Sequence, residues 1–269
     1  MVGDWVYVTI IPEGDSMIEA IRPRKSILKR ADQSGHAIGY VKTMQEQVMV
    51  ANFDYVFILT SLNEDYSLNR IARYVSVTLE GGGIPVVILT KADLCPDVTP
   101  FLKETAALSD KVRVHAISTQ AGLGLEALRP YFREGVTIAL LGSSGVGKST
   151  LVNRLLGRDI MKTSAIREKD GKGRHTTTSS SLFNFPGGGY VIDTPGIRSI
   201  GLSNGEDDMD GETLAKIFPG FFEGDLFTCK YSNCLHLKEP GCSVRAAVES
   251  GKLSWARYAS YLRILNSRN

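Results

Sequence analysis

The feature that most constrains this chain is a glycine-rich segment that joins an apolar run to a helical pattern. The apolar run is Val136–Leu141, the helical pattern is Leu151–Leu156, and residues 142–150 between them read GSSGVGKST. A strand, a glycine-rich turn and a helix start form the context of a phosphate-binding loop, whose backbone N–H groups cradle the phosphates of a nucleotide. Lys148 is predicted to reach the β- and γ-phosphates as a catalytic residue, and Ser149 to bind Mg²⁺. The predicted nucleotide-binding residues of this loop are Gly142, Ser143, Ser144, Gly145, Val146, Gly147, Lys148, Ser149 and Thr150.

Length and composition indicate a globular protein with one substantial core. The chain has 269 residues, of which 43% are hydrophobic and 22% are charged. Its formal net charge of +2 does not by itself indicate a nucleic-acid partner. No apolar run approaches the roughly 20 residues of a membrane span, and the first residues lack the profile of a signal peptide. We therefore expect a cytoplasmic monomer that does not contact a membrane.

Strand-like and helix-like stretches alternate through the middle of the chain. The expected strands are Tyr55–Thr60, Pro85–Leu89, Val112–Ile117 and Val136–Leu141, and the expected helices are Tyr66–Leu79, Thr99–Leu108 and Leu125–Phe132. Further on, Ser181–Phe185 and Tyr190–Ile192 are expected to pair as a hairpin. Strands that alternate with helices at this spacing predict an α/β fold with a mostly parallel sheet and helices on both of its faces.

The segment Thr90-Lys91-Ala92-Asp93 follows one of these strands and is predicted to read the base of the nucleotide. A carboxylate at Asp93 can accept two hydrogen bonds from guanine, whereas adenine offers no such donor pair. The stem of Lys91 can cover the base plane, and Ser118, which ends the next strand, is expected in a loop under the base. Thr90 stands where GTPases usually carry Asn. Alternatively, the segment is a helix N-cap, because Thr and Asp both cap well.

Asp193 and Gly196 complete the predicted nucleotide site. Asp193 ends the second strand of the expected hairpin, where a P-loop nucleotidase needs a carboxylate to hold Mg²⁺ through water. The backbone N–H of Gly196 is predicted to sense the γ-phosphate. The base-reading segment therefore comes before the phosphate loop, which reverses the order of ordinary GTPases. A circular permutation explains this order, since it moves the termini and keeps every strand neighbour.

Three of the four cysteines lie together near the end of the chain with a histidine. The group consists of Cys229, Cys234, His236 and Cys242. Three thiolates and an imidazole suit tetrahedral zinc, and four protein ligands leave no open position, so the site is predicted to be structural. Free thiols are the alternative. The remaining thiol, Cys95, is expected to be a small buried residue.

The first fifty residues are turn-rich and strand-like, and a basic cluster follows the second expected strand. The strands are expected at Trp5–Ile10 and Met17–Ile21. The basic cluster consists of Arg22, Arg24, Lys25, Lys29 and Arg30. It is interpreted either as a solvated loop face or as an RNA-contacting surface.

The motif order, the GRHTTT run at 173–178 and the C-terminal metal cluster resemble a family of circularly permuted bacterial GTPases, ribosome small-subunit-dependent GTPase A. The resemblance covers nearly all of the chain. It implies a GTPase that binds GTP or GDP, Mg²⁺ and Zn²⁺, acts late in maturation of the small (30S) ribosomal subunit, contacts its rRNA and is stimulated by it. The family begins with a full OB-fold barrel, and Met1 falls where the middle of that barrel would be, so a shortened barrel is expected.

The expected organisation is therefore an α/β, circularly permuted P-loop GTPase with two attachments. Residues 1–48 are assigned to a partial OB-fold-like β element, 49–203 to the permuted GTPase domain and 204–269 to a helix-rich, zinc-binding domain. The alternative function is a GTP-regulated switch that acts on a protein partner without RNA. A further variant is an RNA-docking checkpoint, in which hydrolysis only triggers release.

The catalytic group that positions water is not the usual glutamine. Ile197 occupies the place directly after the D-x-x-G motif, where Ras-like proteins carry that residue. His175 is the best candidate, and the resemblance implies that the ribosome orders its loop; a plain exposed histidine is the alternative. Thr177 is predicted to donate its hydroxyl to Mg²⁺, with Thr176 close behind. We hypothesise that residues 165–178 order on the subunit, where their basic side chains meet rRNA phosphates.

Overall fold

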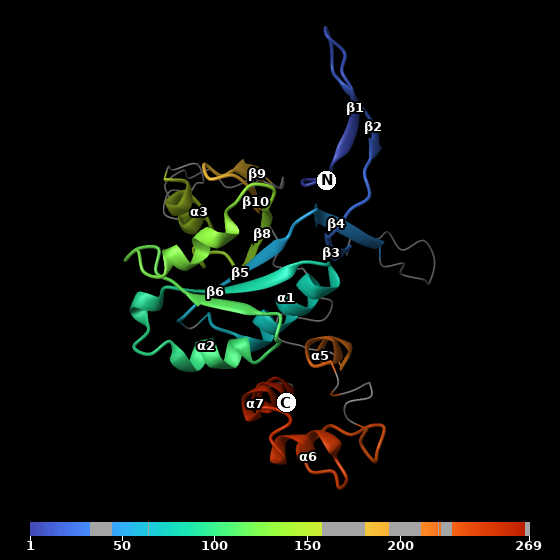
Figure 1. The fold of residues 1–269 in the computed structure, drawn as a ribbon, viewed down its shortest axis with the longest axis vertical. Helices are drawn as coiled ribbons and strands as arrows, with labels where there is room; N and C mark the ends of the chain where they lie inside the picture. The colour runs from blue at the N-terminus through green and yellow to red at the C-terminus, as the bar shows by residue number, and fades with distance from the viewer. Residues whose placement is uncertain are drawn as a thin grey trace.

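A computed structural model describes residues 1–32, 45–63, 65–157, 181–193, 211–219, 221 and 228–266. Figure 1 shows an α/β body, an N-terminal β-hairpin that projects from it, and C-terminal helices packed on one side. Within the described residues, no helix combines the length and the hydropathy that crossing a bilayer requires.

The body is built on a six-stranded sheet with the order β7-β6-β5-β8-β10-β9. Its strands are β5 (Tyr55–Ser61), β6 (Ile84–Thr90), β7 (Arg113–Ala116), β8 (Thr137–Gly142), β9 (Ser181–Asn184) and β10 (Tyr190–Asp193). All neighbours are parallel except β9, which pairs antiparallel with β10 as the hairpin pattern predicted. The central strands are continuous apolar runs because both of their faces are covered.

Helices cover both faces of this sheet, as expected. They are α1 (Leu68–Glu80), α2 (Thr99–Ala106) and α3 (Lys148–Leu156), with the short 3₁₀ helices η1 (Ala92–Leu94) and η2 (Leu125–Tyr131). Alternate residues of β5 serve the two sides: Ile58 packs in the core with α1, and Phe57 in the core with α3 and η2. The segment expected as a helix at 125–132 is a 3₁₀ helix with Pro130 inside it, and proline lacks the N–H that a longer α-helix would need.

Two small antiparallel sheets precede the body. The first pairs β1 (Val6–Thr9) with β2 (Met17–Ile21), and the second pairs β3 (Ile27–Asp32) with β4 (Gln45–Ala51). The chain between these sheets is held by Asn52. Its side chain accepts from the Lys25 N–H (2.9 Å) and donates to the Gly3 carbonyl (2.8 Å), and its own N–H donates to the Ser26 carbonyl (2.9 Å).

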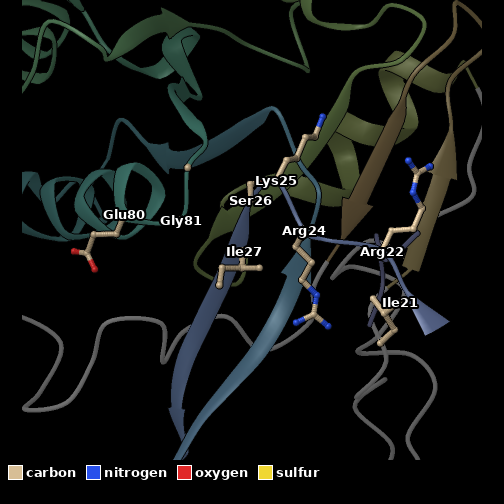
Figure 2. Close-up of a pocket in the computed structure, with 9 residues that line it drawn as sticks. Ile21, Arg22, Arg24, Lys25, Ser26, Ile27, Glu80 and Gly81 are labelled. Carbon is tan, nitrogen blue, oxygen red and sulfur yellow. The ribbon is translucent and has the colours of Figure 1, made fainter. Parts of the chain in front are cut away.

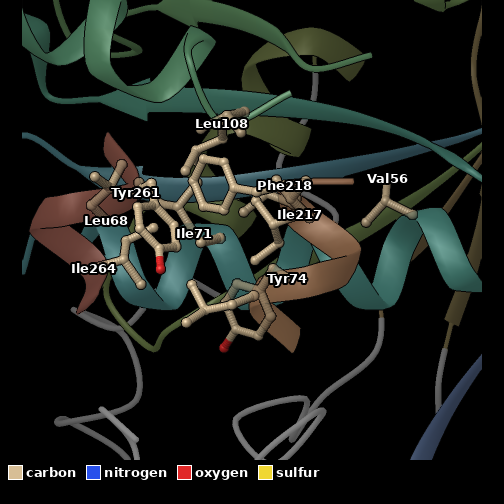
Figure 3. Close-up of a cluster of buried hydrophobic side chains, with 14 of the residues drawn as sticks. Val56, Leu68, Ile71, Tyr74, Leu108, Ile217, Phe218, Tyr261 and Ile264 are labelled. Carbon is tan, nitrogen blue, oxygen red and sulfur yellow. The ribbon is translucent and has the colours of Figure 1, made fainter. Parts of the chain in front are cut away.

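The C-terminal helices are α5 (Gly211–Ile217), α6 (Ser243–Glu249) and α7 (Trp255–Asn266). Figure 3 shows Phe218, Tyr261 and Ile264 packed against the Leu68–Tyr74 side of α1. Tyr258, Tyr261 and Leu265 are buried and form the packing face of α7. Arg257 of α7 donates to the Leu108 and Ile217 carbonyls, and so links three segments that are distant in sequence.

Candidate nucleotide site and metal cluster

The phosphate-loop sequence forms a tight turn from β8 into α3. Gly142 has a φ of 148°, and a Cβ there would lie 2.6 Å from the Leu59 carbonyl oxygen of β5, so only glycine fits. Gly145 and Gly147 also have positive φ angles, of 79° and 101°. Helix α3 begins at Lys148, whose Nζ donates to the Gly142 carbonyl (2.5 Å) and the Ser143 carbonyl (2.6 Å). The helix N-terminus and the ammonium group therefore meet at one turn, which suits an anionic ligand.

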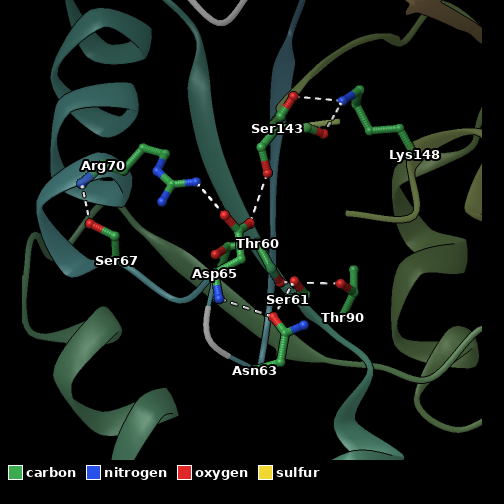
Figure 4. A network of polar contacts seen from close by, with 10 residues as sticks. Thr60, Ser61, Asn63, Asp65, Ser67, Arg70, Thr90, Ser143 and Lys148 are labelled. Carbon is green, nitrogen blue, oxygen red and sulfur yellow. Dashed lines mark hydrogen bonds and ion pairs between the residues drawn. The ribbon is translucent and has the colours of Figure 1, made fainter. Parts of the chain in front are cut away.

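The base-reading segment is joined directly to this loop. Thr90 is buried at the end of β6, and its hydroxyl donates to the Val146 carbonyl (2.8 Å) and lies 3.3 Å from the Thr60 carbonyl. Figure 4 shows Thr60 and Thr90 at the carboxyl ends of the neighbouring strands β5 and β6. Lys91 has a left-handed φ of 58°, and Asp93 is exposed in η1. No side chain caps η1, so the interpretation of Thr90 as a helix N-cap is wrong.

Ser118 lies in a loop packed directly beneath the base-reading segment. Its side chain is buried and its hydroxyl accepts from the Ala121 N–H (3.0 Å). The neighbouring Ile117 carbonyl accepts from the Ala92 N–H (3.0 Å), between Lys91 and Asp93. Two loops that follow adjacent parallel strands are thus joined by a backbone hydrogen bond.

The magnesium-binding predictions fall partly within the described residues. Asp193 ends β10, pairs in register with Leu140 of β8 and buries one carboxylate oxygen. Ser149 lies in the first turn of α3. A carboxylate and a hydroxyl are donors that Mg²⁺ accepts, so the two residues fit this ion. The predictions for His175, Thr177 and Gly196 lie outside the described residues.

Sequence reasoning missed Asp65, which touches the phosphate loop. Its carboxylate accepts from the Ser143 hydroxyl (2.8 Å) and from Arg70 of α1 (2.7 Å). The available signal was the polar stretch directly after β5, at the sheet edge where ligands of parallel α/β folds bind.

The four predicted metal ligands come together in space. The ligand atoms of Cys229, Cys234, His236 and Cys242 all lie within 4.8 Å of one another. His236 Nδ1 is 3.5 Å from both the Cys229 and the Cys242 sulfur atoms. Tetrahedral zinc with bonds of about 2.0–2.3 Å places its ligands about 3.3–3.8 Å apart, so this donor set fits zinc. Burial raises the pKa of the Cys234 thiol to about 12, and binding of a metal as thiolate would displace that proton.

Cys95 is half-buried rather than buried. It follows η1, close to the exposed Asp93, and its thiol donates to the Asp97 carbonyl (3.3 Å). The expectation of a buried residue is met only in part: Cys95 packs against the edge of the buried cluster around α1, while the residues on either side of it are exposed.

Two cations of the N-terminal basic cluster are paired within the molecule. Arg24 binds both carboxylate oxygens of Asp4 (2.7 and 2.8 Å), and Lys25 binds Asp54 (2.7 Å). Arg22, Arg24 and Lys25 line a hollow of about 540 Å³, shown in Figure 2. Its far wall is formed by Gly81 and Gly82, at the end of α1 opposite to Asp65, so the hollow is separate from the phosphate loop.

The order of strands and motifs defines this molecule as a circularly permuted GTPase. A similar fold occurs in YjeQ from Thermotoga maritima, with a TM-score of 0.65 and 29% identity over 99% of this chain and 84% of that one. The structure of YloQ, described as a circularly permuted GTPase, has a TM-score of 0.60 and 23% identity over 99% of this chain and 80% of that one.

A family model described as RsgA GTPase matches residues 21–203, and the chain belongs to this family. A Lactiplantibacillus plantarum protein named small ribosomal subunit biogenesis GTPase RsgA 2 is 44% identical over 98% of this chain and 70% of its own length. A Syntrophotalea carbinolica protein named small ribosomal subunit biogenesis GTPase RsgA is 42% identical over 97% of this chain and 71% of its own length.

Proposed function

We propose that this protein hydrolyses GTP to GDP and phosphate during biogenesis of the small ribosomal subunit. The observation that carries the proposal is the Thr90–Val146 hydrogen bond, which fixes the base-reading segment against the phosphate loop. One pocket can then bind a guanine and its phosphates together. The names of the relatives support the biological role, since they describe GTPases of small-subunit biogenesis.

In this proposal each part of the site has a separate task. Asp93 selects guanine, Lys91 and Ser118 cover the two sides of the base, and Thr90 holds the loop that carries Lys91 and Asp93. The phosphate loop binds the phosphates, and Lys148 stabilises the charge that develops on the transferred group. Ser149 and Thr177 would hold Mg²⁺ directly and Asp193 would hold it through water, and the bound ion would neutralise phosphate charge. Gly196 senses the γ-phosphate, and His175 positions the attacking water.

The remaining parts are proposed to serve the ribosomal partner. We assign residues 1–48 to a partial OB-like element, 49–203 to the GTPase domain and 204–269 to a zinc-binding domain. The zinc site would be structural, and rRNA phosphates would meet the basic loop before Thr177. We place the protein in the cytoplasm as a monomer. If affinity for the subunit depends on phosphate contacts, it will fall steeply with salt concentration.

GTP turnover measured with and without purified small subunits tests this function. We expect slow turnover by the protein alone, because Ile197 cannot orient water, and a large stimulation by small subunits but not by large subunits. Turnover that purified subunits do not stimulate would contradict the ribosomal role. It would favour the alternative, a switch that acts on a protein partner without RNA.

His175 is tested by the same assay. A His175→Ala protein should lose most of the stimulated rate while it still binds GTP, because the substitution removes only the group that positions water. His115→Gln is the matched control, since His115 bonds Tyr131 through its Nε2 (2.9 Å) away from the phosphate loop. An unchanged stimulated rate in His175→Ala would remove this histidine from the mechanism.

A further inference from the structure

Asp65 occupies a position that the proposed mechanism does not use. It follows β5, the strand that lies between β6 and β8, so it stands beside the first turn of the phosphate loop. Its Oδ2 accepts the Ser143 hydroxyl at 2.8 Å. Figure 4 shows the carboxylate between the loop and α1.

The Asp65 carboxylate is itself held from two directions. Arg70, in the first turn of α1, donates to Oδ1 at 2.7 Å. The Asp65 N–H donates at 3.1 Å to the Asn63 side chain, which also accepts the Ser61 hydroxyl at 2.7 Å. Burial raises the pKa of Asp65, but the bonds from Arg70 and Ser143 more than offset it, and the pKa lies below its ordinary value. Asp65 is therefore an ionised, preorganised acceptor.

Ser143 passes this restraint on to Lys148. Its hydroxyl binds Asp65, and its carbonyl accepts the Lys148 ammonium at 2.6 Å. The bond between its hydroxyl and Asp65 restrains the position of Ser143, and with it the position of the carbonyl that Lys148 contacts. The ammonium group that reaches the phosphates is thus linked through two residues to the first turn of α1.

We propose that Asp65 is a positioning residue for the phosphate loop: through Ser143 it directs the Lys148 ammonium toward the β- and γ-phosphates. The inference rests on the proposed function, because it gives Lys148 its role there. It predicts an effect that depends on the γ-phosphate. A misdirected Lys148 weakens binding of a triphosphate more than binding of a diphosphate, whereas a general structural defect weakens both alike.

Displacement of a fluorescent guanine nucleotide by GDP and by the slowly hydrolysed analogue GTPγS tests the proposal. We expect Asp65→Ala and Ser143→Ala each to weaken GTPγS binding about tenfold and GDP binding about threefold or less. The double variant should be no weaker than either single variant, because both remove the same restraint. Asp65→Asn keeps an acceptor for the Ser143 hydroxyl, so its GTPγS affinity should lie between those of wild type and Asp65→Ala. Ser143→Thr keeps the hydroxyl and should restore most of the affinity.

Asp110→Ala is the matched control. Asp110 is exposed on the surface and lies 3.9 Å from Arg257, away from the loop, and its removal should change neither affinity by more than about twofold. Wild-type-like GTPγS affinity in both single variants would overturn the proposal, as would equal losses for GDP and GTPγS. An additive double variant would show that Asp65 does not act through Ser143. If Asp65→Ala fails to fold, the GTPγS and GDP affinities of Ser143→Ala and Asp65→Asn test the proposal in its place. Failure of the wild type to bind any guanine nucleotide would instead overturn the proposed function.

Discussion

At the residue scale, Thr90 stands where GTPases usually carry asparagine, and its side chain links two segments that are distant in sequence. The Thr90 side chain has a single hydroxyl, and burial at the end of β6 directs it to the Val146 carbonyl. This hydroxyl therefore ties the end of β6 directly to the backbone of the phosphate-loop sequence.

Thr90→Val should remove the hydrogen bond between the end of β6 and the phosphate loop, with little change in the volume of the side chain. The valine cannot donate to Val146, so we expect the free energy of unfolding to fall by about 1–2 kcal/mol and guanine nucleotide affinity to fall about tenfold. Thr78→Val is the control, because the Thr78 hydroxyl is equally buried and donates to Tyr74 inside α1. It should reduce the stability similarly and leave affinity unchanged. Equal guanine nucleotide affinities of Thr90→Val and Thr78→Val in a titration would argue against a role of the Thr90–Val146 bond in binding.

The Asp4–Arg24 pair should make the N-terminal segment sensitive to acid. The bond from Arg24 lowers the pKa of Asp4 from 3.8 to about 2. Because the folded pKa lies below the unfolded value, the pair stabilises the fold at and above about pH 4, and this stabilisation disappears as the pH falls through 2. Urea unfolding of Asp4→Asn should show a deficit of about 1 kcal/mol at neutral pH that shrinks by about pH 3. A loss of unfolding free energy in Asp4→Asn that does not change with pH would contradict a lowered pKa of Asp4.

At the element scale, the metal loop is shaped by hydrogen bonds as well as by its ligands. His236 has a left-handed φ of 61°. Glu239 accepts from the N–H groups of Leu235, Leu237 and Lys238 at 2.8–3.0 Å. Tyr258 of α7 donates to the His236 carbonyl at 2.5 Å. These bonds hold the left-handed backbone of His236 and the turn around it in place.

Glu239→Ala should therefore weaken zinc binding without removing a ligand. Loss of the three acceptor bonds frees the loop, and we expect the zinc affinity to fall about tenfold in competition with a colorimetric chelator. Glu249→Ala is a suitable control, since Glu249 lies on α6 and pairs only weakly with Arg245 at 3.9 Å. An unchanged zinc affinity in Glu239→Ala would show that the four ligands alone shape the loop.

Most strands and helices were predictable because their signals are local. The apolar run Val86–Leu89 predicts a buried strand, and the glycines of the phosphate loop predict a tight turn with positive φ angles; both are observed. The contacts of Thr90 with Val146 and of Asp65 with Ser143 were not predictable. They depend on which strands become neighbours, and that order is set by tertiary packing. The partial exposure of Cys95 was not predictable for a similar reason, since it depends on what covers the loop.

At the scale of the whole molecule, α1 is shared by two regions. Its first turn faces the phosphate loop through Arg70 and Asp65, and its apolar side packs against α5 and α7. The C-terminal helices thus belong to the same buried cluster as one face of the sheet. We expect the body and these helices to unfold together.

Tyr261→Ala tests this shared core. Tyr261 is fully buried, contacts Phe218 edge-on at 5.5 Å and donates to the Leu235 carbonyl at 2.9 Å. Its truncation should lower the free energy of unfolding by about 3–5 kcal/mol and weaken zinc binding as well. Tyr231→Ala, at a position 42% exposed, should have little effect on either. A separate early transition of the C-terminal helices, with the sheet unaffected, would contradict a shared core.

The most direct measurement is nucleotide competition against a bound fluorescent guanine nucleotide, with wild type and Asp93→Ala compared. We predict that GTP and GDP displace the probe from wild type, that ATP does not, and that Asp93→Ala loses most of this preference, because the carboxylate alone accepts both guanine donors. Equal displacement by ATP and GTP in the wild type would contradict a single pocket formed by the base-reading segment and the phosphate loop.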